Sequence, residues 1–514
     1  MIELLRETGC WQAGAGAVIM GAVRRGANCT LRRSALSRVN LNREYLRNKI
    51  HGCWLGKNIG GTLGAPFEGR TEINDVTFYA QPTRGEPLPN DDLDLQLVWL
   101  KAIQENGPRA VNNRLLGEYW LNYISPHWNE YGICKANMRA GLLPPLSGEY
   151  HNHWKHSNGA WIRSEIWACL APGCPDVAIR YAYEDASVDH GGGEGTYAAL
   201  FTAAVESAAF VTNDRDELIK IGLSKIPPDC RVARSIGIVL DAYAAGKSWQ
   251  EARELVVQDS SDLGWFQAPA NVAFVIIGWL YGGGDFGRSI CLATNCGDDT
   301  DCTAATLGAI LGIILGKDQI PGKWVEPIGD RILTVAIDRG SIHVPATLAE
   351  LTEQVAAQVP LMLAAHGAPV SVSDAPTDLA AVGELNLASD AVAKSVWARS
   401  PFAVTYDFIH TLVTLDYHRE PDVRADEPFA VTVTLVNKLP DCRHMELKWR
   451  LPEGWTVSPS AVNHVTLWNY GANSAAVEAQ ITPGPVRGGA YRGMLEVVAF
   501  GRPTVGAIPL VFFA

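Results

Sequence analysis

The sequence predicts a multidomain protein, with a large all-α domain followed by a small all-β sandwich. From Leu41 to about Gly367, long segments rich in Ala and Leu are interrupted by Gly, Pro and Asn, which is typical of helices. Near the C-terminus the apolar period changes to two, and Phe429, Val431 and Val433 fall on one side of a predicted strand. The predicted parts are an N-terminal extension (residues 1–38), a helical domain (39–367), a linker (368–400) and a β-sandwich (401–514).

Glycines mark the first long helix of the predicted helical domain. Gly56, Gly60 and Gly64 recur every four residues, so that they form one small face of a helix before Pro66 ends it. Such a face permits close packing against a neighbouring helix.

The last helix of this domain has recognisable ends. Thr347 and Glu350 have the spacing of a capping box, and the helix is expected to end at Gly367. The linker that follows has room for one more helix near residues 378–393.

The composition indicates a reduced, cytoplasmic protein. Eleven cysteines have no regular spacing, and the longest apolar run, Thr303 to Gly316, is shorter than the roughly 20 residues of a membrane span. A secretion signal stays open as an alternative, because Ala13 to Ala22 is small and apolar. Acidic residues precede it, however, where a signal peptide has basic ones.

The charge balance argues against nucleic acid as a partner. Lys and Arg number 43 against 55 Asp and Glu, which gives a formal net charge of −12. This sign is wrong for broad contact with a phosphate backbone.

Two acidic clusters each precede a predicted helix. The first runs from Asn90 to Asp94 and the second from Asp298 to Cys302. One Asp at a helix start is explained by capping, but three carboxylates within five residues would repel one another unless a cation lies among them. Their hard oxygens suit Mg²⁺, Mn²⁺ or Ca²⁺, as one or two ions.

Two Gly-rich segments also carry polar residues. Glu68 follows the first long helix on a constrained loop, where it is either a catalytic side chain or a solvated one. The segment Asp185 to Gly195 surrounds Asp189, His190 and Glu194 with glycines, but it lacks a Lys and a Ser or Thr at the fixed spacing of a phosphate-binding loop.

Together these four elements resemble the ADP-ribosylglycohydrolase family over roughly Val39 to Arg339. The stretch Gly60 to Glu68 resembles the family's Gly-Asp-Ala-Leu-Gly signature, Asn90-Asp91-Asp92 its Thr-Asp-Asp motif, and Gly297 to Cys302 its Gly-Gly-Asp-Thr-Asp-Thr motif. The resemblance implies an all-helical domain with a binuclear Mg²⁺ or Mn²⁺ centre. The implied ligands are Asn90, Asp91, Asp92, Asp299, Asp301 and Cys302.

Several residues depart from the family pattern. Gly61 replaces the signature Asp, while Asn90 and Cys302 replace two Thr ligands. An amide oxygen still suits a hard cation, whereas a thiol is a poor ligand for one, so that one metal position is expected to be weakened or lost. Glu165 adds a carboxylate to a segment that in the family usually has Arg but no acidic residue in its core.

The resemblance implies a metal-dependent hydrolase that cleaves a glycosidic bond to ADP-ribose, with Glu68 as base or substrate clamp. The candidate substrate-binding residues are Asn158, Arg163, Asp189 and His190. The expected partner is a small-molecule or glycan substrate, with no membrane and with a homo-oligomer left open.

Two alternatives remain at this point. In the first, the enzyme hydrolyses plain sugars or glycans, with Glu165 and Glu194 as an additional acid and base pair. In the second, the chain is a binding protein that has kept the fold and lost turnover.

Overall fold

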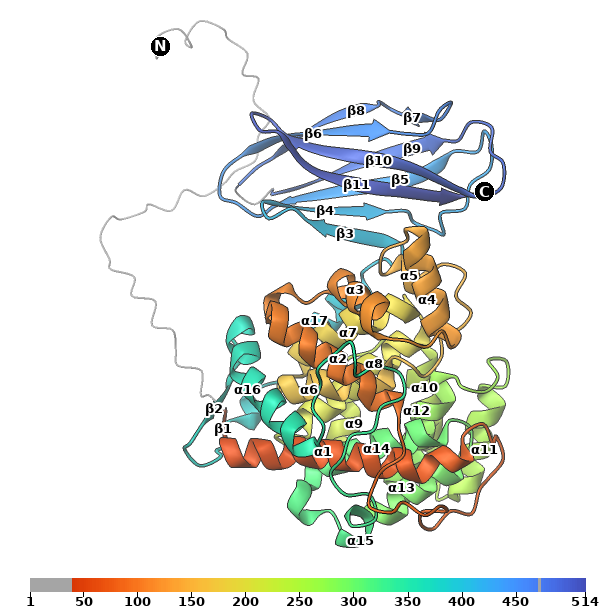
Figure 1. The fold of residues 1–514 in the computed structure, drawn as a ribbon, viewed down its shortest axis with the longest axis vertical. Helices are drawn as coiled ribbons and strands as arrows, with labels where there is room; N and C mark the ends of the chain where they lie inside the picture. The colour runs from red at the N-terminus through yellow and green to blue at the C-terminus, as the bar shows by residue number, and fades with distance from the viewer. Residues whose placement is uncertain (1–38, 470–472) are drawn as a thin grey trace, which may run out of the picture. The chain divides into compact units, whose positions relative to one another are not determined.

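The computed structural model describes residues 39–469 and 473–514 and confirms the predicted fold class (Figure 1). The predicted extension over residues 1–38, with its apolar stretch, lies outside the described residues. A helical domain is followed by an all-β region made of antiparallel sheets.

Sixteen of the seventeen α-helices in the described part of the chain lie before residue 367 and form most of the helical domain. They are α1 (Arg43–Gly64), α2 (Asp91–Asn106), α3 (Asn113–Tyr123), α4 (Asn129–Ala140), α5 (Leu146–Glu149), α6 (Glu165–Leu170), α7 (Pro175–His190), α8 (Glu194–Ala208), α9 (Arg215–Leu223), α10 (Arg231–Ala244), α11 (Trp249–Asp259), α12 (Ala268–Tyr281), α13 (Phe286–Asn295), α14 (Thr300–Leu315), α15 (Gly322–Val325) and α16 (Leu348–His366).

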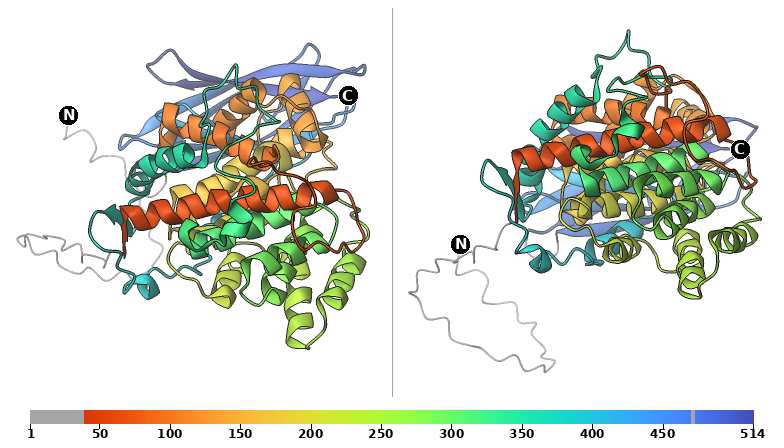
Figure 2. Two further views of the ribbon diagram at one scale, coloured as in Figure 1. Left: turned by 60° about the horizontal axis from the view of Figure 1, so that its bottom comes forward. Right: turned by 90° about the horizontal axis from the view of Figure 1, so that it is seen from below.

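Helices α1 and α14 lie side by side through the domain (Figures 1 and 2). The glycine face predicted on α1 meets the backbone of α14, because a Cβ atom on Gly56 would overlap the carbonyl oxygen of Gly308. A Cβ on Gly60 would meet Ala304 in the same way, and one on Gly64 would meet Thr300. The glycines therefore set how closely the two helices approach, and they bring the end of α1 to the start of α14.

Replacing Gly56 with alanine is expected to lower the free energy of unfolding by about 1–3 kcal/mol, because the added methyl group forces the two backbones apart. The matched control is Gly237→Ala in α10, where a Cβ meets no atom within 4 Å. That change should raise the free energy of unfolding by up to about 1 kcal/mol through helix propensity. Urea unfolding followed by circular dichroism measures both, and equal effects would contradict this account of the helix contact.

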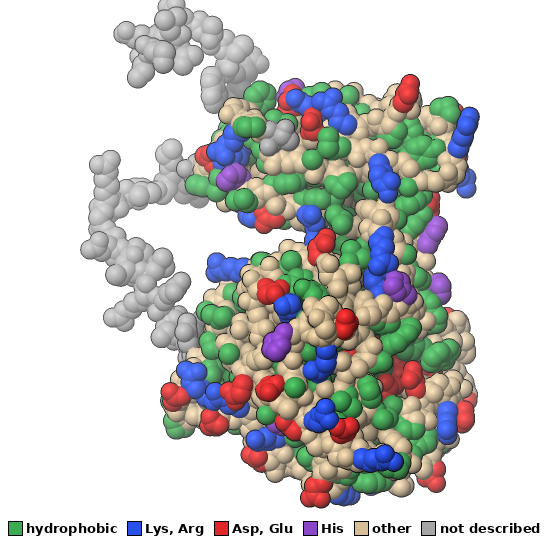
Figure 3. All heavy atoms as spheres, viewed as in Figure 1, with side chains coloured by type: hydrophobic (Ala, Val, Ile, Leu, Met, Phe, Trp, Pro, Cys, Tyr) green, Lys and Arg blue, Asp and Glu red, His purple; other side chains and the backbone are tan. Residues whose placement is uncertain are grey.

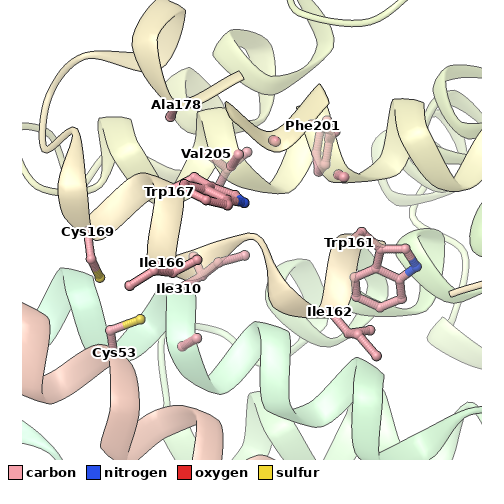
Figure 4. Close-up of a cluster of buried hydrophobic side chains, with 14 of the residues drawn as sticks. Cys53, Trp161, Ile162, Ile166, Trp167, Cys169, Ala178, Phe201, Val205 and Ile310 are labelled. Carbon is pink, nitrogen blue, oxygen red and sulfur yellow. The ribbon is translucent and has the colours of Figure 1, made fainter. Parts of the chain in front are cut away.

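The hydrophobic core of the helical domain extends from α1 across α6 and α8. Figure 4 shows part of it, with Cys53 of α1 and Cys169 of α6 pointing toward each other near Ile166 and Trp167. All four side chains are fully buried, and both cysteines are free. This packing places α6 against the middle of α1.

The ends of α16 agree with the sequence. Thr347 accepts a hydrogen bond from the backbone N–H of Glu350 at 3.1 Å, and Gly367 ends the helix in the left-handed conformation at φ 58°. The Glu350 side chain accepts from the backbone of Ala346 instead of Thr347, so only half of the predicted capping box forms.

Residues 368–400 form more than a linker. Strand β2 (Val370–Ser373) pairs in parallel with β1 (Val39–Asn42), and helix α17 (Ala391–Trp397) buries Ala393 and Val396 in the core of the helical domain. The β1–β2 pair joins the start of α1 to the chain that follows α16. The predicted helix in this region lies some residues later than expected, because Asp390 is its N-cap.

The all-β region consists of two antiparallel sheets around one hydrophobic cluster. One sheet has the order β11-β10-β6-β8 and the other β3-β4-β5-β9-β7. The strands are β3 (Ala403–Asp407), β4 (Thr411–Asp416), β5 (Phe429–Asn437), β6 (Arg443–Arg450), β7 (Thr456–Ser458), β8 (Val462–Leu467), β9 (Ser474–Thr482), β10 (Ala490–Ala499) and β11 (Thr504–Phe513). The predicted alternation in β5 is confirmed, since Phe429, Val431 and Val433 are buried.

The surface carries charges of both signs. On the face drawn in Figure 3, basic and acidic side chains are interspersed over the helical domain. Within the described residues, none of the helices combines the length and the hydropathy that crossing a bilayer requires.

Candidate metal and substrate site

A cavity of about 340 Å³ opens where α2 and α14 begin. The two acidic clusters of the sequence meet here. The close contact between α1 and α14 also places Glu68, just after α1, beside the start of α14. The lining residues are Ala65, Glu68, Pro89, Asn90, Asp91, Trp128, Asn129, Glu130, Tyr131, Gly159, Ile162, Trp265, Phe266, Asp299, Asp301, Cys302 and Val335.

The first acidic cluster begins helix α2. The Asn90 side-chain oxygen caps the helix by accepting from the backbone N–H of Asp92 at 2.7 Å, while its amide nitrogen donates to Asp301 Oδ2 at 3.3 Å. Gly61 makes room for this arrangement, since a Cβ there would lie 2.6 Å from Asn90 Nδ2. Asp91 lines the cavity and accepts a hydrogen bond from the hydroxyl of Tyr131 at 2.8 Å.

The second acidic cluster begins helix α14. Asp299 is fully buried, and its Oδ2 accepts from Asn158 Nδ2 at 2.7 Å. Asp298 has a positive φ of 68° and points away from the cavity, where it accepts from the backbone N–H of Phe266 at 2.7 Å. The cluster therefore supplies two carboxylates to the cavity, Asp299 and Asp301, while Asp298 holds the loop that carries Phe266.

Four groups of side chains among the described residues have the spacing of metal ligands, and two of them overlap at the start of α14. One is Glu68, Asp299 and Asp301, and the other is Asp92, Asp301 and Cys302, each with its ligand atoms within 4.8 Å of one another. Asp299 Oδ1 and Asp301 Oδ1 are buried and accept no hydrogen bond. Unpartnered carboxylate oxygens of this kind fit a hard divalent cation such as Mg²⁺ or Mn²⁺.

The electrostatics of these carboxyl groups suit a bound cation. The Glu68 side chain is exposed at the cavity, but partial desolvation, with the nearby carboxylates of Asp299 and Asp91, raises its pKa to about 7. Burial and the carboxylate of Asp299 also raise the pKa of Asp301 well above its ordinary value. These carboxyl groups lack the positive charge that would keep them ionised.

The thiol of Cys302 differs from the other members of the second group. Burial, followed by the charges of Asp299 and Asp301, raises its pKa well above the ordinary value for cysteine. The protonated thiol lies 3.6 Å from Asp92 Oδ1, to which it donates.

The two further predicted acid–base residues do not line the cavity. Glu165 is fully buried in α6, where its carboxylate accepts from Lys57 Nζ at 2.7 Å and from Gln96 Nε2 at 2.8 Å. Glu194 accepts from the backbone N–H groups of Arg231 and Val232, at 3.0 Å each, and so caps the start of α10. The structure gives Glu165 and Glu194 no shared position for a substrate.

Of the predicted substrate-binding residues, Arg163, Asp189 and His190 lie behind the cavity wall, and all three are fully buried. Arg163 donates to Asp189 at 2.8 Å, and His190 Nδ1 lies 2.9 Å from the same carboxylate. Asn158 does not line the cavity but donates a hydrogen bond to Asp299, which does. These residues form a charged support for the loop around Gly159, which does line the cavity.

Sequence reasoning missed several cavity residues. Glu130 of α4 is 2% exposed, its Oε2 accepts no hydrogen bond, and burial raises its pKa to about 7. Trp128 and Trp265 are 48% and 44% exposed at the same cavity. These positions lie on segments without a motif, so that only the tertiary structure brings them to the site.

The fold and the site define a class of protein, namely a helical domain with a carboxylate-lined cavity whose side chains have the spacing of metal ligands. Within this class, the chain belongs to the ADP-ribosylglycohydrolase family, whose profile matches residues 42–359. The match spans the whole helical region that carries the two acidic clusters.

Individual relatives are distant. An uncharacterized protein of Archaeoglobus fulgidus is 23% identical over 299 residues, which cover 56% of this chain and 93% of the relative. The ADP-ribosylarginine hydrolase Tri1 of Pseudomonas putida is 22% identical over 300 residues, covering 56% of this chain and 76% of the relative. A solved structure described as an ADP-ribosylglycohydrolase-related protein complex has 17% identity and a TM-score of 0.43, covering 62% of this chain and 99% of its own.

Proposed function

We propose that the chain is a metal-dependent hydrolase that cleaves a glycosidic bond to ADP-ribose, with ADP-ribosyl-arginine as the first substrate to test. The observation that carries the proposal is the convergence of Glu68, Asp299 and Asp301 at one cavity, with unpartnered oxygens on both Asp residues. Family membership and the relative named as an ADP-ribosylarginine hydrolase support the substrate class.

The residues around the cavity have separable roles in this proposal. Glu68, Asp299 and Asp301 would hold the divalent ion, which when bound polarises the reacting centre and orients substrate oxygens. Asn158 fixes the orientation of Asp299 through its hydrogen bond at 2.7 Å, and Tyr131 fixes Asp91 in the same manner at 2.8 Å.

One further carboxyl group is available for proton transfer. Glu130 of α4 lines the cavity, and burial raises its pKa to about 7, which suits exchange of a proton near neutral pH. In our assignment Glu130 acts on the attacking water, while Glu68 holds the ion and clamps the substrate.

The exposed indoles of Trp128 and Trp265 provide flat apolar surfaces at the cavity. Stacking on such rings stabilises a bound base by about 1–3 kcal/mol, and the same apolar faces can pack against a sugar ring. They are compatible both with ADP-ribose and with a plain sugar, so they do not separate the two substrate classes.

The test is turnover of a paired panel, in which ADP-ribosyl-arginine, ADP-ribosyl-serine and poly(ADP-ribose) are compared with aryl glycosides. Each is assayed with Mg²⁺, Mn²⁺, Ca²⁺ or EDTA. We expect release of ADP-ribose that EDTA abolishes. Release from aryl glycosides alone would favour the glycan alternative, and binding of ADP-ribose without any turnover would favour the binding protein.

A further inference from the structure

A buried lysine lies beside one of the two candidate ligand groups. Lys57 belongs to α1, one residue after Gly56, and is 2% exposed. Its Nζ lies 3.2 Å from Asp92 Oδ2 and 2.7 Å from Glu165 Oε1, and it also donates to the backbone carbonyl of Ile162. The ammonium group is therefore held between two carboxylates in the protein interior.

The oxygens of Asp92 are both engaged without a metal ion. Asp92 Oδ2 accepts no formal hydrogen bond but faces the Lys57 ammonium, and Oδ1 accepts from the thiol of Cys302 at 3.6 Å. Glu165 completes the cluster, since its second oxygen accepts from Gln96 Nε2 at 2.8 Å. Each carboxylate in this cluster thus already has a cationic or hydrogen-bonding partner.

The other ligand group has no such cation. Among the described residues, no Lys or Arg forms an ion pair with Glu68, Asp299 or Asp301. Asp299 Oδ1 and Asp301 Oδ1 are instead left without partners. The two groups share Asp301 and differ in where positive charge is already supplied.

We propose that the Lys57 ammonium takes the cation position next to Asp92, so that the chain binds a single divalent ion, held by Glu68, Asp299 and Asp301. A dication bound to Asp92 would lie close to a buried ammonium and would be repelled by it. The thiol of Cys302 adds no hard oxygen ligand to offset that repulsion. The proposal rests on the proposed metal-dependent function and specifies its metal content.

The experiment is the stoichiometry of Mn²⁺ binding, measured by equilibrium dialysis and by electron paramagnetic resonance of the bound ion. We expect one Mn²⁺ per wild-type chain, with the spectrum of an isolated ion. Lys57→Met is expected to bind two, with the spectrum of a coupled pair, because the vacated position between Asp92 and Glu165 attracts a second dication. Cys302→Thr, which adds an oxygen ligand but keeps Lys57, should still bind one.

Two further variants keep the test decisive. If Lys57→Met does not fold with two unpaired carboxylates, Lys57→Met/Glu165→Gln removes the Lys57–Glu165 ion pair and keeps a side chain that can bond Gln96. This double variant should also bind two Mn²⁺, because Asp92 and Asp301 remain and no longer face an ammonium group. Lys220→Met, on the exposed face of α9, removes a charge elsewhere and should leave the stoichiometry at one.

The inference would be overturned by two Mn²⁺ per wild-type chain, or by one Mn²⁺ in each Lys57 variant that folds. In either case the metal-dependent function would still stand if EDTA abolishes turnover. Wild-type protein that binds no Mn²⁺, Mg²⁺ or Ca²⁺ would overturn both.

Discussion

Asp301→Asn is expected to abolish divalent metal binding and to lower turnover by about 10³-fold, since losing the charge stabilisation that a metal supplies costs several kcal/mol in the transition state. Asp301 belongs to both candidate ligand groups, and its Oδ1 has no partner in the protein. The asparagine keeps the shape of the side chain but loses the charge and one acceptor oxygen.

The same substitution should not destabilise the metal-free protein. Burial and the negative charges of Asp299, Asp92 and Glu68 oppose ionisation of Asp301, as its raised pKa records. Removing one carboxylate from this cluster relieves repulsion, so that the midpoint of thermal unfolding without metal should stay level or rise. Loss of activity with unchanged stability would separate a functional role from a structural one.

The control is Asp241→Asn on the exposed face of α10, which makes the same change in charge away from the cavity. It should leave turnover, metal affinity and stability unchanged. Isothermal titration with Mn²⁺ and thermal unfolding, with and without EDTA, measure all three. An Asp301→Asn protein that still binds Mn²⁺ with wild-type affinity would remove Asp301 from the metal centre.

Much of the fold could be predicted because local patterns decide it. The four-residue spacing of Gly56, Gly60 and Gly64 predicts a close helix contact, and the structure identifies the partner as α14. The alternation in Phe429, Val431 and Val433 predicts a strand with one buried side. No local pattern predicts that Val370–Ser373 pairs with the strand before α1, because this pairing joins residues that are far apart in the sequence.

The site was predictable where a motif carries it and not elsewhere. The spacing of the acidic clusters, together with the family resemblance, places Asp91, Asp299 and Asp301 at one cavity. Lys57 and Glu130 lie on helices whose sequences look ordinary, and they reach the site only through helix packing. The additional carboxylate of Glu165 was visible in the sequence, but its pairing with Lys57 was not, because that contact depends on how α1 and α6 pack.

The largest effect on stability is expected from Arg163→Met. Arg163 is fully buried and donates to Asp185 at 3.0 Å and to Asp189 at 2.8 Å, with its guanidinium 5.2 Å from the ring of Trp120. Removing one partner of a buried ion pair costs about 3–5 kcal/mol, because the other charges stay buried without compensation. That loss is a large part of the roughly 5–15 kcal/mol by which folded proteins are stable.

The effect of Arg163→Met should grow as the pH rises. In the wild type, burial raises the pKa of Asp189, but Arg163 and then His190 outweigh burial and lower it below the ordinary value. This contribution is therefore present above the unfolded pKa of about 3.9 and is lost as the pH falls through the folded pKa. Without Arg163, burial raises the pKa of the Asp189 carboxyl group in the folded protein above its value in the unfolded chain. The folded protein then keeps a proton that the unfolded chain releases. The variant then loses stability with rising pH, and its deficit should be greater at pH 8 than at pH 5.

Urea unfolding at pH 5 and pH 8 measures this deficit, with Arg180→Met on the exposed side of α7 as the matched control that should change little. Arg163→Lys keeps the charge but loses the planar fork, so it should fall between the wild type and Arg163→Met. A deficit independent of pH would mean that packing against Trp120 outweighs the two ion pairs. A deficit that grows with pH would mean that Arg163 stabilises the fold by neutralising Asp185 and Asp189, next to the Gly159 carbonyl to which it also donates.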